Sequence, residues 1–101
     1  MKKFQLVELI ATHFTQNSEI WWITSHEEID KWLTAIVNQT SQHAKITSDG
    51  ATTYTQGLGK QAPEVFNLLV RHLCENGFEP FSVACRGAFN FVHAFRREVS
   101  E

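Results

Sequence analysis

The residues best able to do chemistry in this chain are its five histidines and two cysteines. No two histidines form a His-x-x-x-His pair, and none stands at zinc-finger spacing from a cysteine. His72 and Cys74 are two residues apart in an expected helix, so their side chains point in different directions. The sequence therefore predicts no metal site and no cofactor. We expect surface histidines, with His93 partly buried.

Neither cysteine has the surroundings of a catalytic nucleophile. Cys74 falls near the C-terminal end of the expected helix, where the helix dipole opposes a thiolate. Cys85 stands beside Arg86 and before Gly87, which suits a thiolate better, but an ordinary turn cysteine has the same pattern. A strand leaving Gly77 would carry Cys85 roughly 26 Å from that turn at about 3.3 Å per residue, beyond disulfide reach. We expect two free thiols.

The acidic residues and the glycine-rich stretch supply no catalytic pair. Glu27, Glu28 and Asp30 are explained by the positive end of a helix dipole. Residues 57–60, Gly-Leu-Gly-Lys, resemble a phosphate-binding turn but lack the spacing Gly-x-x-x-x-Gly-Lys-Ser/Thr, and Pro63 removes a backbone donor. No catalytic residue is assigned, so the sequence favours a non-enzymatic protein without excluding an enzyme.

The adjacent tryptophans Trp21 and Trp22 are more informative. Neighbours on a strand point to opposite faces of a sheet, so both indoles cannot enter the same core. Either one ring lies on the surface as an interaction site, or the segment 38–61 folds over it. Both alternatives remain open from the sequence.

Composition limits the class of protein. The 101 residues are 43% hydrophobic with a formal net charge of −2, which predicts a single domain, 1–101, and no nucleic-acid partner. The first residues begin like a signal peptide, but Gln5 and Glu8 interrupt the apolar run, and no stretch approaches the roughly 20 residues of a transmembrane helix. We expect a cytoplasmic protein.

The expected elements alternate between strands and helices. Residues 4–15 fit a strand better than a helix, and residues 19–24 form a second strand. A helix follows, capped by Ser25 with Glu28 three residues later, and its apolar stripe is Ile29, Trp32, Leu33, Ile36 and Val37. Residues 46–54 form either a hairpin around Asp49-Gly50 or a mobile loop.

The C-terminal half is the best specified part. A second helix starts at Pro63, buries Val65, Phe66, Leu69, Val70 and Leu73, and stops at Asn76-Gly77. Residues 78–83 form a strand whose Pro80 requires an edge position, and residues 89–98 form the last strand. The prediction is an α+β fold, with an antiparallel sheet of four to five strands and two helices on one face, in the order β-β-α-(β)-α-β-β.

Part of this half resembles a known family. Leu68-Leu69, Leu73, Gly77-Phe78, Val83 and the closing Arg96-Arg97 are similar to the C-terminal helix–glycine–strand–strand segment of raftlin-like proteins, and of a small bacterial domain of unknown function. The resemblance covers residues 63–97. It implies the same order of elements and no catalytic residue. Raftlins are acylated membrane-raft proteins, but position 2 of this sequence is Lys and not Gly, so we do not expect their membrane association to carry over.

These observations lead to three functional hypotheses. The leading one is a non-enzymatic interaction or assembly module, binding a protein partner or a second copy through an aromatic sheet surface that includes Trp21, Trp22, Phe89 and Phe91. The alternative is a small-ligand or phosphate-binding protein, with residues 47–60 as a lid over Tyr54, Lys60 and His93. A membrane-surface protein, which is disfavoured, would need Lys2, Lys3, Arg96 and Arg97 on one face.

Overall fold

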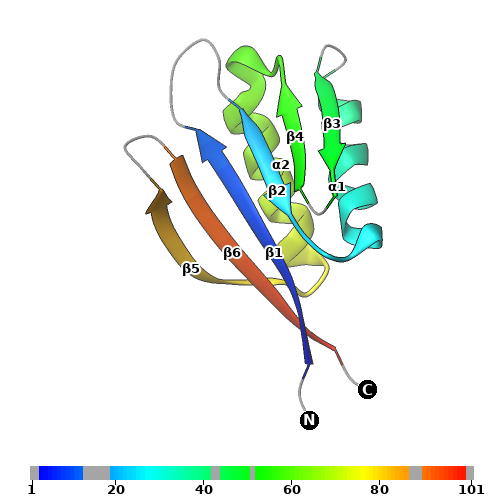
Figure 1. Ribbon diagram of the computed structural model, residues 1–101, viewed down its shortest axis with the longest axis vertical. Coiled ribbons are helices and arrows are strands. Elements are labelled where there is room, and N and C mark those ends of the chain that lie inside the picture. Colours follow the sequence, from blue (N-terminus) through cyan, green and yellow to red (C-terminus); the bar gives the residue numbers. More distant parts are fainter. Residues whose placement is uncertain (1–2, 13–18, 42–43, 51, 87–89, 100–101) are drawn as a thin grey trace.

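The computed structural model describes residues 3–12, 19–41, 44–50, 52–86 and 90–99 (Figure 1). The helices are α1 (Glu27–Thr40) and α2 (Ala62–Glu75), the latter preceded by a 3-10 turn (Gly59–Gln61). The strands are β1 (Lys3–Thr12), β2 (Ile20–Ile23), β3 (Lys45–Asp49), β4 (Thr52–Gln56), β5 (Glu79–Arg86) and β6 (Asn90–Val99).

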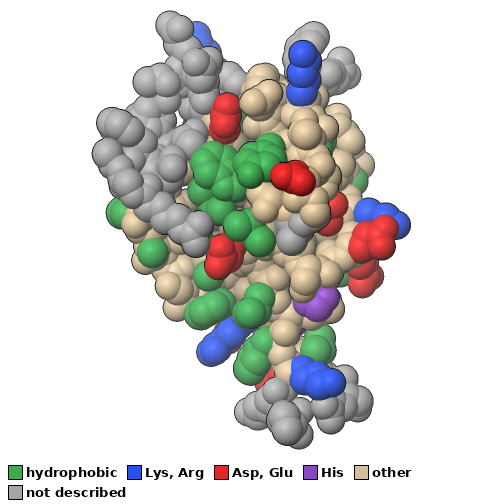
Figure 2. Space-filling view, in the orientation of Figure 1, with side chains coloured by type: hydrophobic (Ala, Val, Ile, Leu, Met, Phe, Trp, Pro, Cys, Tyr) green, Lys and Arg blue, Asp and Glu red, His purple; other side chains and the backbone are tan. Residues whose placement is uncertain are grey.

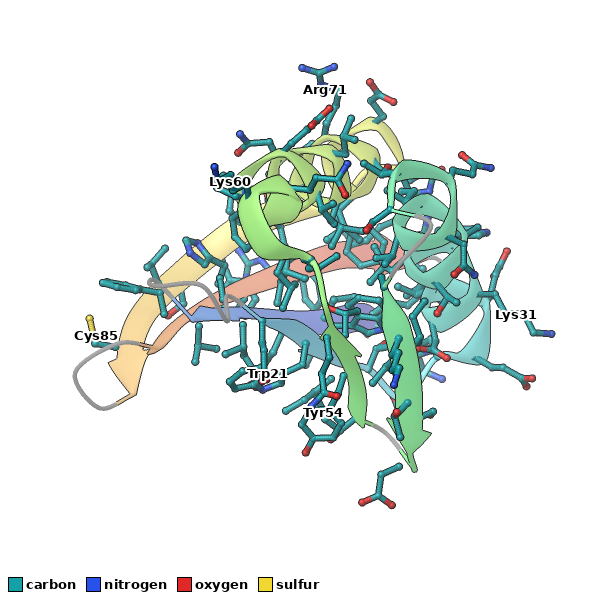
Figure 3. All side chains as sticks on the ribbon, turned by 90° about the horizontal axis from the view of Figure 1, so that it is seen from above. Trp21, Lys31, Tyr54, Lys60, Arg71 and Cys85 are labelled. Carbon is teal, nitrogen blue, oxygen red and sulfur yellow. The ribbon has the colours of Figure 1, made fainter. Side chains whose placement is uncertain are left out.

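The described strands form one antiparallel sheet in the order β3-β4-β2-β1-β6-β5. Both helices cover the same face of this sheet, as the view in Figure 3 shows. The predicted α+β class and the position of the helices are therefore confirmed. The sheet has six strands where four to five were expected, because the segment between the helices contributes two strands.

The β3–β4 hairpin settles the alternative left open for residues 46–54. Its turn contains Gly50 in the left-handed region, at φ 65°, a conformation that glycine adopts without strain. Thr53 and Thr55 of β4 are buried on the helix side despite their hydroxyls. The Thr55 hydroxyl donates to the Ile20 carbonyl at 2.6 Å, which satisfies it inside the core. The hairpin interpretation is correct, and threonines replace the apolar residues whose scarcity favoured a loop.

Helix α1 begins one residue later than predicted, because its N-cap is His26 and not Ser25. The residue before the helix is His26, whose side chain makes no capping bond, so the box of Ser25 and Glu28 is wrong. Thr24 takes a related role, because its hydroxyl accepts the His26 N–H at 3.2 Å and donates to the Leu6 carbonyl at 3.1 Å. This pair of bonds ties the start of the helix to β1. The predicted apolar stripe is confirmed, with Ile29, Leu33 and Val37 fully buried and Trp32 and Ile36 packed beside them.

Helix α2 ends as its sequence predicts. The Phe78 N–H reaches the Leu73 carbonyl at 2.9 Å, and the Gly77 N–H reaches the Cys74 carbonyl at 3.2 Å. These two hydrogen bonds together form the Schellman motif. The motif needs a residue in the left-handed conformation, and Gly77 supplies it at φ 89°. Phe78 and Leu73 are both buried in the core. The chain then enters β5, an edge strand as Pro80 requires, with a register shift between Pro80 and Ser82.

The main core lies between the sheet and the two helices. Its sheet side is formed by alternate residues of the central strands, including Val7, Leu9, Trp22 and Phe95. Its helix side is formed by the buried stripes of α1 and α2, including Leu33 and Leu69. The opposite side of the sheet carries neither helix, and we call it the open face (Figures 1 and 3).

Candidate functional site

The two tryptophans lie on opposite faces of β2. Trp22 is fully buried in the core, while Trp21 is half-buried on the open face. The segment 38–61 does not fold over Trp21, since its strand β4 extends the sheet beside β2. From β4, Tyr54 brings its ring centroid to 6.1 Å from that of Trp21, at an interplanar angle of 37°. Figure 3 shows the two side chains below the sheet, on the side away from the helices.

A continuous row of apolar residues crosses the open face. The strand registers set Tyr54 opposite Trp21, Trp21 opposite Ile10, Ile10 opposite Val92, and Val92 opposite Ala84. These five residues, one from each of five neighbouring strands, are called the apolar row. Because neighbouring strands are about 4.8 Å apart, the row is roughly 19 Å long. Ile10, at the centre of the row, is 1% exposed and its neighbour Val92 is also buried, whereas Tyr54 at one end of the row is 40% exposed.

A second group of exposed apolar side chains lies farther along the same face. Leu6, which is 52% exposed, stands opposite Arg96 in the β1–β6 register. The Arg96 guanidinium lies 5.1 Å from the ring centroid of Phe4 and 5.2 Å from that of Phe81, and its Nε donates to Glu79 at 2.9 Å. We call Phe4, Leu6, Phe81 and Arg96 the Arg96 cluster. Figure 2, which looks onto the open face, shows hydrophobic side chains near its middle and again toward the end where the termini lie.

Other predicted interaction residues lie elsewhere. Phe91 pairs with Ala11 and is half-buried on the helix side of β6, together with His93 and Phe95. It therefore does not share the open face with Trp21. Phe89 lies outside the described residues. Strand alternation explains the outcome for Phe91, because odd-numbered residues of β6 face the helices.

The residues of the ligand-binding alternative are not brought together. Tyr54 lies on the open face and Lys60 is exposed in the turn before α2, on the helix side (Figure 3). His93 is half-buried, with its ring centroid 5.0 Å from that of Phe66. The expected lid, 47–60, is largely the hairpin of β3 and β4. These three side chains occupy three separate places and define no common pocket.

Two depressions lie along the helices. One, of about 430 Å³, has a polar lining of Thr24, Ser25, Glu27, Asp30, Ser48 and Gly50. Asp30 has a structural role there, because its Oδ1 accepts bonds from Trp22 Nε1 at 2.7 Å and from the Thr53 hydroxyl at 2.6 Å. The other, of about 210 Å³, lies between α1 and α2. Within the described ranges, no three His, Cys, Asp or Glu side chains gather as metal ligands.

Arg97 performs a structural task on the helix side. Its Nε donates to Gln5 Oε1 at 2.9 Å, and its Nη1 donates to the Asn76 carbonyl at 2.9 Å. Its guanidinium lies between two rings, 5.5 Å from the centroid of Trp32 and 4.7 Å from that of Phe78. It thereby joins β1, both helices and the start of β5. Arg96 and Arg97 face opposite sides of the sheet, so the shared basic surface of the membrane hypothesis is not formed by this pair.

Comparison with protein-family models and with curated proteins finds no match. Among the described residues, no helix is long and apolar enough to cross a membrane. The two cysteines are free and exposed. The candidate site is therefore the open face itself. Its members Ile10, Val92, Leu6 and Phe81 were not predicted. One signal was available, because β1 is apolar at both alternating sets of positions, and such a strand places apolar side chains on both faces of the sheet.

Proposed function

We propose that this protein is a non-enzymatic interaction module that binds a protein partner through the open face of its sheet. The observation that carries this proposal is the placement of exposed apolar side chains. Among the described residues, the large exposed hydrophobics are Phe4, Leu6, Tyr54, Phe81 and Val83. All except Val83 belong to the apolar row or the Arg96 cluster. A gathering of this kind on one face is typical of an interaction surface, whereas scattered exposed residues are ordinary.

The chemistry of the face also supports a protein partner. Tyr54 and Trp21 are aromatic residues with one polar atom each, the type enriched at the centre of protein interfaces. Arg96 stacks on two rings and keeps an ion pair with Glu79, and arginine is likewise enriched at such surfaces. The free, exposed cysteines agree with a reducing compartment, so we place the module in the cytoplasm as part of the same proposal.

Site-specific photo-crosslinking tests the proposal in the cells that produce the protein. A photoreactive phenylalanine analogue replaces Tyr54 on the open face, and in a matched variant it replaces Asn67, which is exposed on α2. We expect a discrete protein crosslink, to another chain or to a second copy, from position 54 and none from position 67. Equal crosslinking at the two positions, or none at position 54, would show that the open face is not the binding surface.

A further inference from the structure

We infer that the edge strand β5 binds an extended segment of a partner protein, which joins the sheet as an added strand. This inference goes beyond the proposed function, because it concerns an edge of the sheet and not the open face. It also states the conformation of the bound segment, which is extended because it forms strand hydrogen bonds with β5.

The two edges of the sheet differ in their protection against such pairing. At one edge, β3 places Lys45, Thr47 and Asp49 on the open face, where all three are exposed. Charged side chains on an edge strand discourage pairing with another chain. At the opposite edge, residues 81–85 of β5 read Phe-Ser-Val-Ala-Cys, and each of them is exposed. This stretch contains no charged residue, so it lacks the protection that β3 has.

Pro80 and the register shift beside it determine which part of β5 can pair. Proline has no N–H, and the β5–β6 ladder is irregular between Pro80 and Ser82. From Ser82 to Arg86 the register is regular. Alternate residues of an edge strand direct their N–H and C=O groups away from the sheet, which gives about two or three outward residues in these five. Among the described residues, no strand lies on that side of β5, so an extended chain can pair there.

Val83 favours an added strand over a partner that rests on the open face. Val83 is 61% exposed, more than any other large hydrophobic residue in the described ranges, and it lies on the helix side, opposite His93. Phe81 is 48% exposed and has its ring on the open face, beside Arg96. A partner on the open face would cover Phe81 and leave Val83 in water. A strand paired with β5 places side chains on both faces, because its alternate residues point to opposite sides.

The helices leave β5 uncovered. Within the described ranges, the main core cluster includes no residue of β5. In Figure 3, the end of β5 that carries Cys85 extends beyond α2. The strand is thus held mainly by its pairing with β6, and both of its faces are open beside the edge.

The neighbours of the added strand predict the chemistry of the bound segment. On the open face, a side chain beside Ala84 would extend the apolar row, which runs to the β5 edge but stops short of β3, where Thr47 stands opposite Tyr54. On the helix side, a side chain beside Val83 would also be apolar. We therefore expect an uncharged run of about five residues, rich in the β-branched and aromatic types that strands favour.

Selection from a phage-displayed library of random heptapeptides, with the purified chain as bait, tests the inference. We expect enrichment of uncharged peptides rich in β-branched and aromatic residues. N-methylation of a selected peptide should weaken binding at alternate residues only, since only alternate N–H groups point toward β5. Val83→Lys should weaken binding at least about tenfold, because a lysine on an edge strand opposes pairing. The matched control is Ser48→Lys, exposed on the helix side of β3, and it should leave binding unchanged.

Hydrogen exchange gives a second measurement on the unsubstituted chain. With a selected peptide at about 100 times its Kd, every second amide between Ser82 and Arg86 should exchange at least about tenfold more slowly than in the free chain. The amides already bonded to β6 should change little. Circular dichroism melts confirm that the Val83→Lys and Ser48→Lys variants fold.

Three results would overturn the inference. The first is that no peptide is enriched, and the second is that binding is indifferent to N-methylation or to Val83→Lys. The third is growth in mass of the purified chain with concentration that Val83→Lys abolishes, because a second copy would then occupy the edge. None of them decides the proposed function, which depends on the crosslink from position 54.

Discussion

Asp30 holds α1 against the sheet. Its replacement should therefore lower the free energy of unfolding more than replacement of Glu27 or Glu28, the other acidic residues of the first helical turn. One of its oxygens accepts hydrogen bonds from the fully buried Trp22, at 2.7 Å, and from Thr53, at 2.6 Å. Trp22 and Thr53 are opposite each other on β2 and β4. Asp30→Ala therefore leaves two neighbouring donors without an acceptor on the buried side of the sheet.

The expected magnitude follows from these two donors. An unpaired buried indole N–H costs about 1–3 kcal/mol, and a buried threonine hydroxyl that can rotate costs about 1 kcal/mol. The free energy of unfolding should therefore fall by about 2–4 kcal/mol. For a domain of this size, 1 kcal/mol corresponds to about 4–8 °C in Tm, so we expect Tm to fall by about 8–30 °C.

Urea denaturation monitored by circular dichroism measures this loss in the free energy of unfolding, and three further variants serve as comparisons. Asp30→Asn keeps an acceptor oxygen at the same position and should lose only about 1 kcal/mol. Glu28→Gln removes an exposed charge from the same helical turn and reports the helix-dipole contribution, about 0.3–1 kcal/mol. The double variant Asp30→Ala with Thr53→Val should be less destabilised than the sum of its parts by about 1 kcal/mol. The reasoning would be refuted if Asp30→Ala and Asp30→Asn were equally mild, or if the two sites were additive.

Three further substitutions test the end of α2 and strands β6 and β4. Gly77→Ala should lower the free energy of unfolding by about 1–2 kcal/mol, because φ is 89° there and a Cβ would stand 3.3 Å from the Arg97 Cδ; an unchanged urea midpoint would contradict this. Arg97→Lys should destabilise by about 1–2 kcal/mol through loss of the planar contacts with Trp32 and Phe78 and of the bonds to Gln5 and Asn76. The matched variant Arg96→Lys also loses contacts with two rings, but those rings and the ion pair with Glu79 are exposed to solvent, so it should cost less than about 1 kcal/mol. Thr55→Val should cost about 1 kcal/mol in the same assay, since it leaves the Ile20 carbonyl without its donor; a stabilised variant would indicate that the hydroxyl is dispensable.

The parts of the fold that follow from local rules were predictable. The α2 helix, its Gly77 stop and the edge position of Pro80 depend on neighbours in sequence, and the structure confirms each. The start of α1 was not predictable in the same way. Ser25 fits a capping box locally, but Thr24 is bonded to the Leu6 carbonyl of β1, and that tertiary bond places the helix start at Glu27.

The open face was predictable only in part. The opposite directions of Trp21 and Trp22 follow from strand geometry alone. The partners of Trp21 do not, because Tyr54 and Val92 come from strands that are distant in sequence, and even Ile10 of the preceding strand lies opposite Trp21 only in one register. The polar composition of residues 46–54 also left the choice between a hairpin and a loop open, since buried threonines with satisfied hydroxyls look like loop residues in sequence.

The two faces of the sheet contribute differently to stability and to binding. Among the described residues, the main core cluster draws only on the helix side, and Ile10 and Val92 are buried on the open face outside it. The energy that holds the helices on the sheet is therefore largely independent of Tyr54 and Leu6. Exposed apolar side chains on a face that does not hold the fold together lower solubility unless a partner covers them. Polar substitutions at Tyr54 or Leu6 should thus leave Tm nearly unchanged while they reduce association, and a protein using this face for folding would show the reverse.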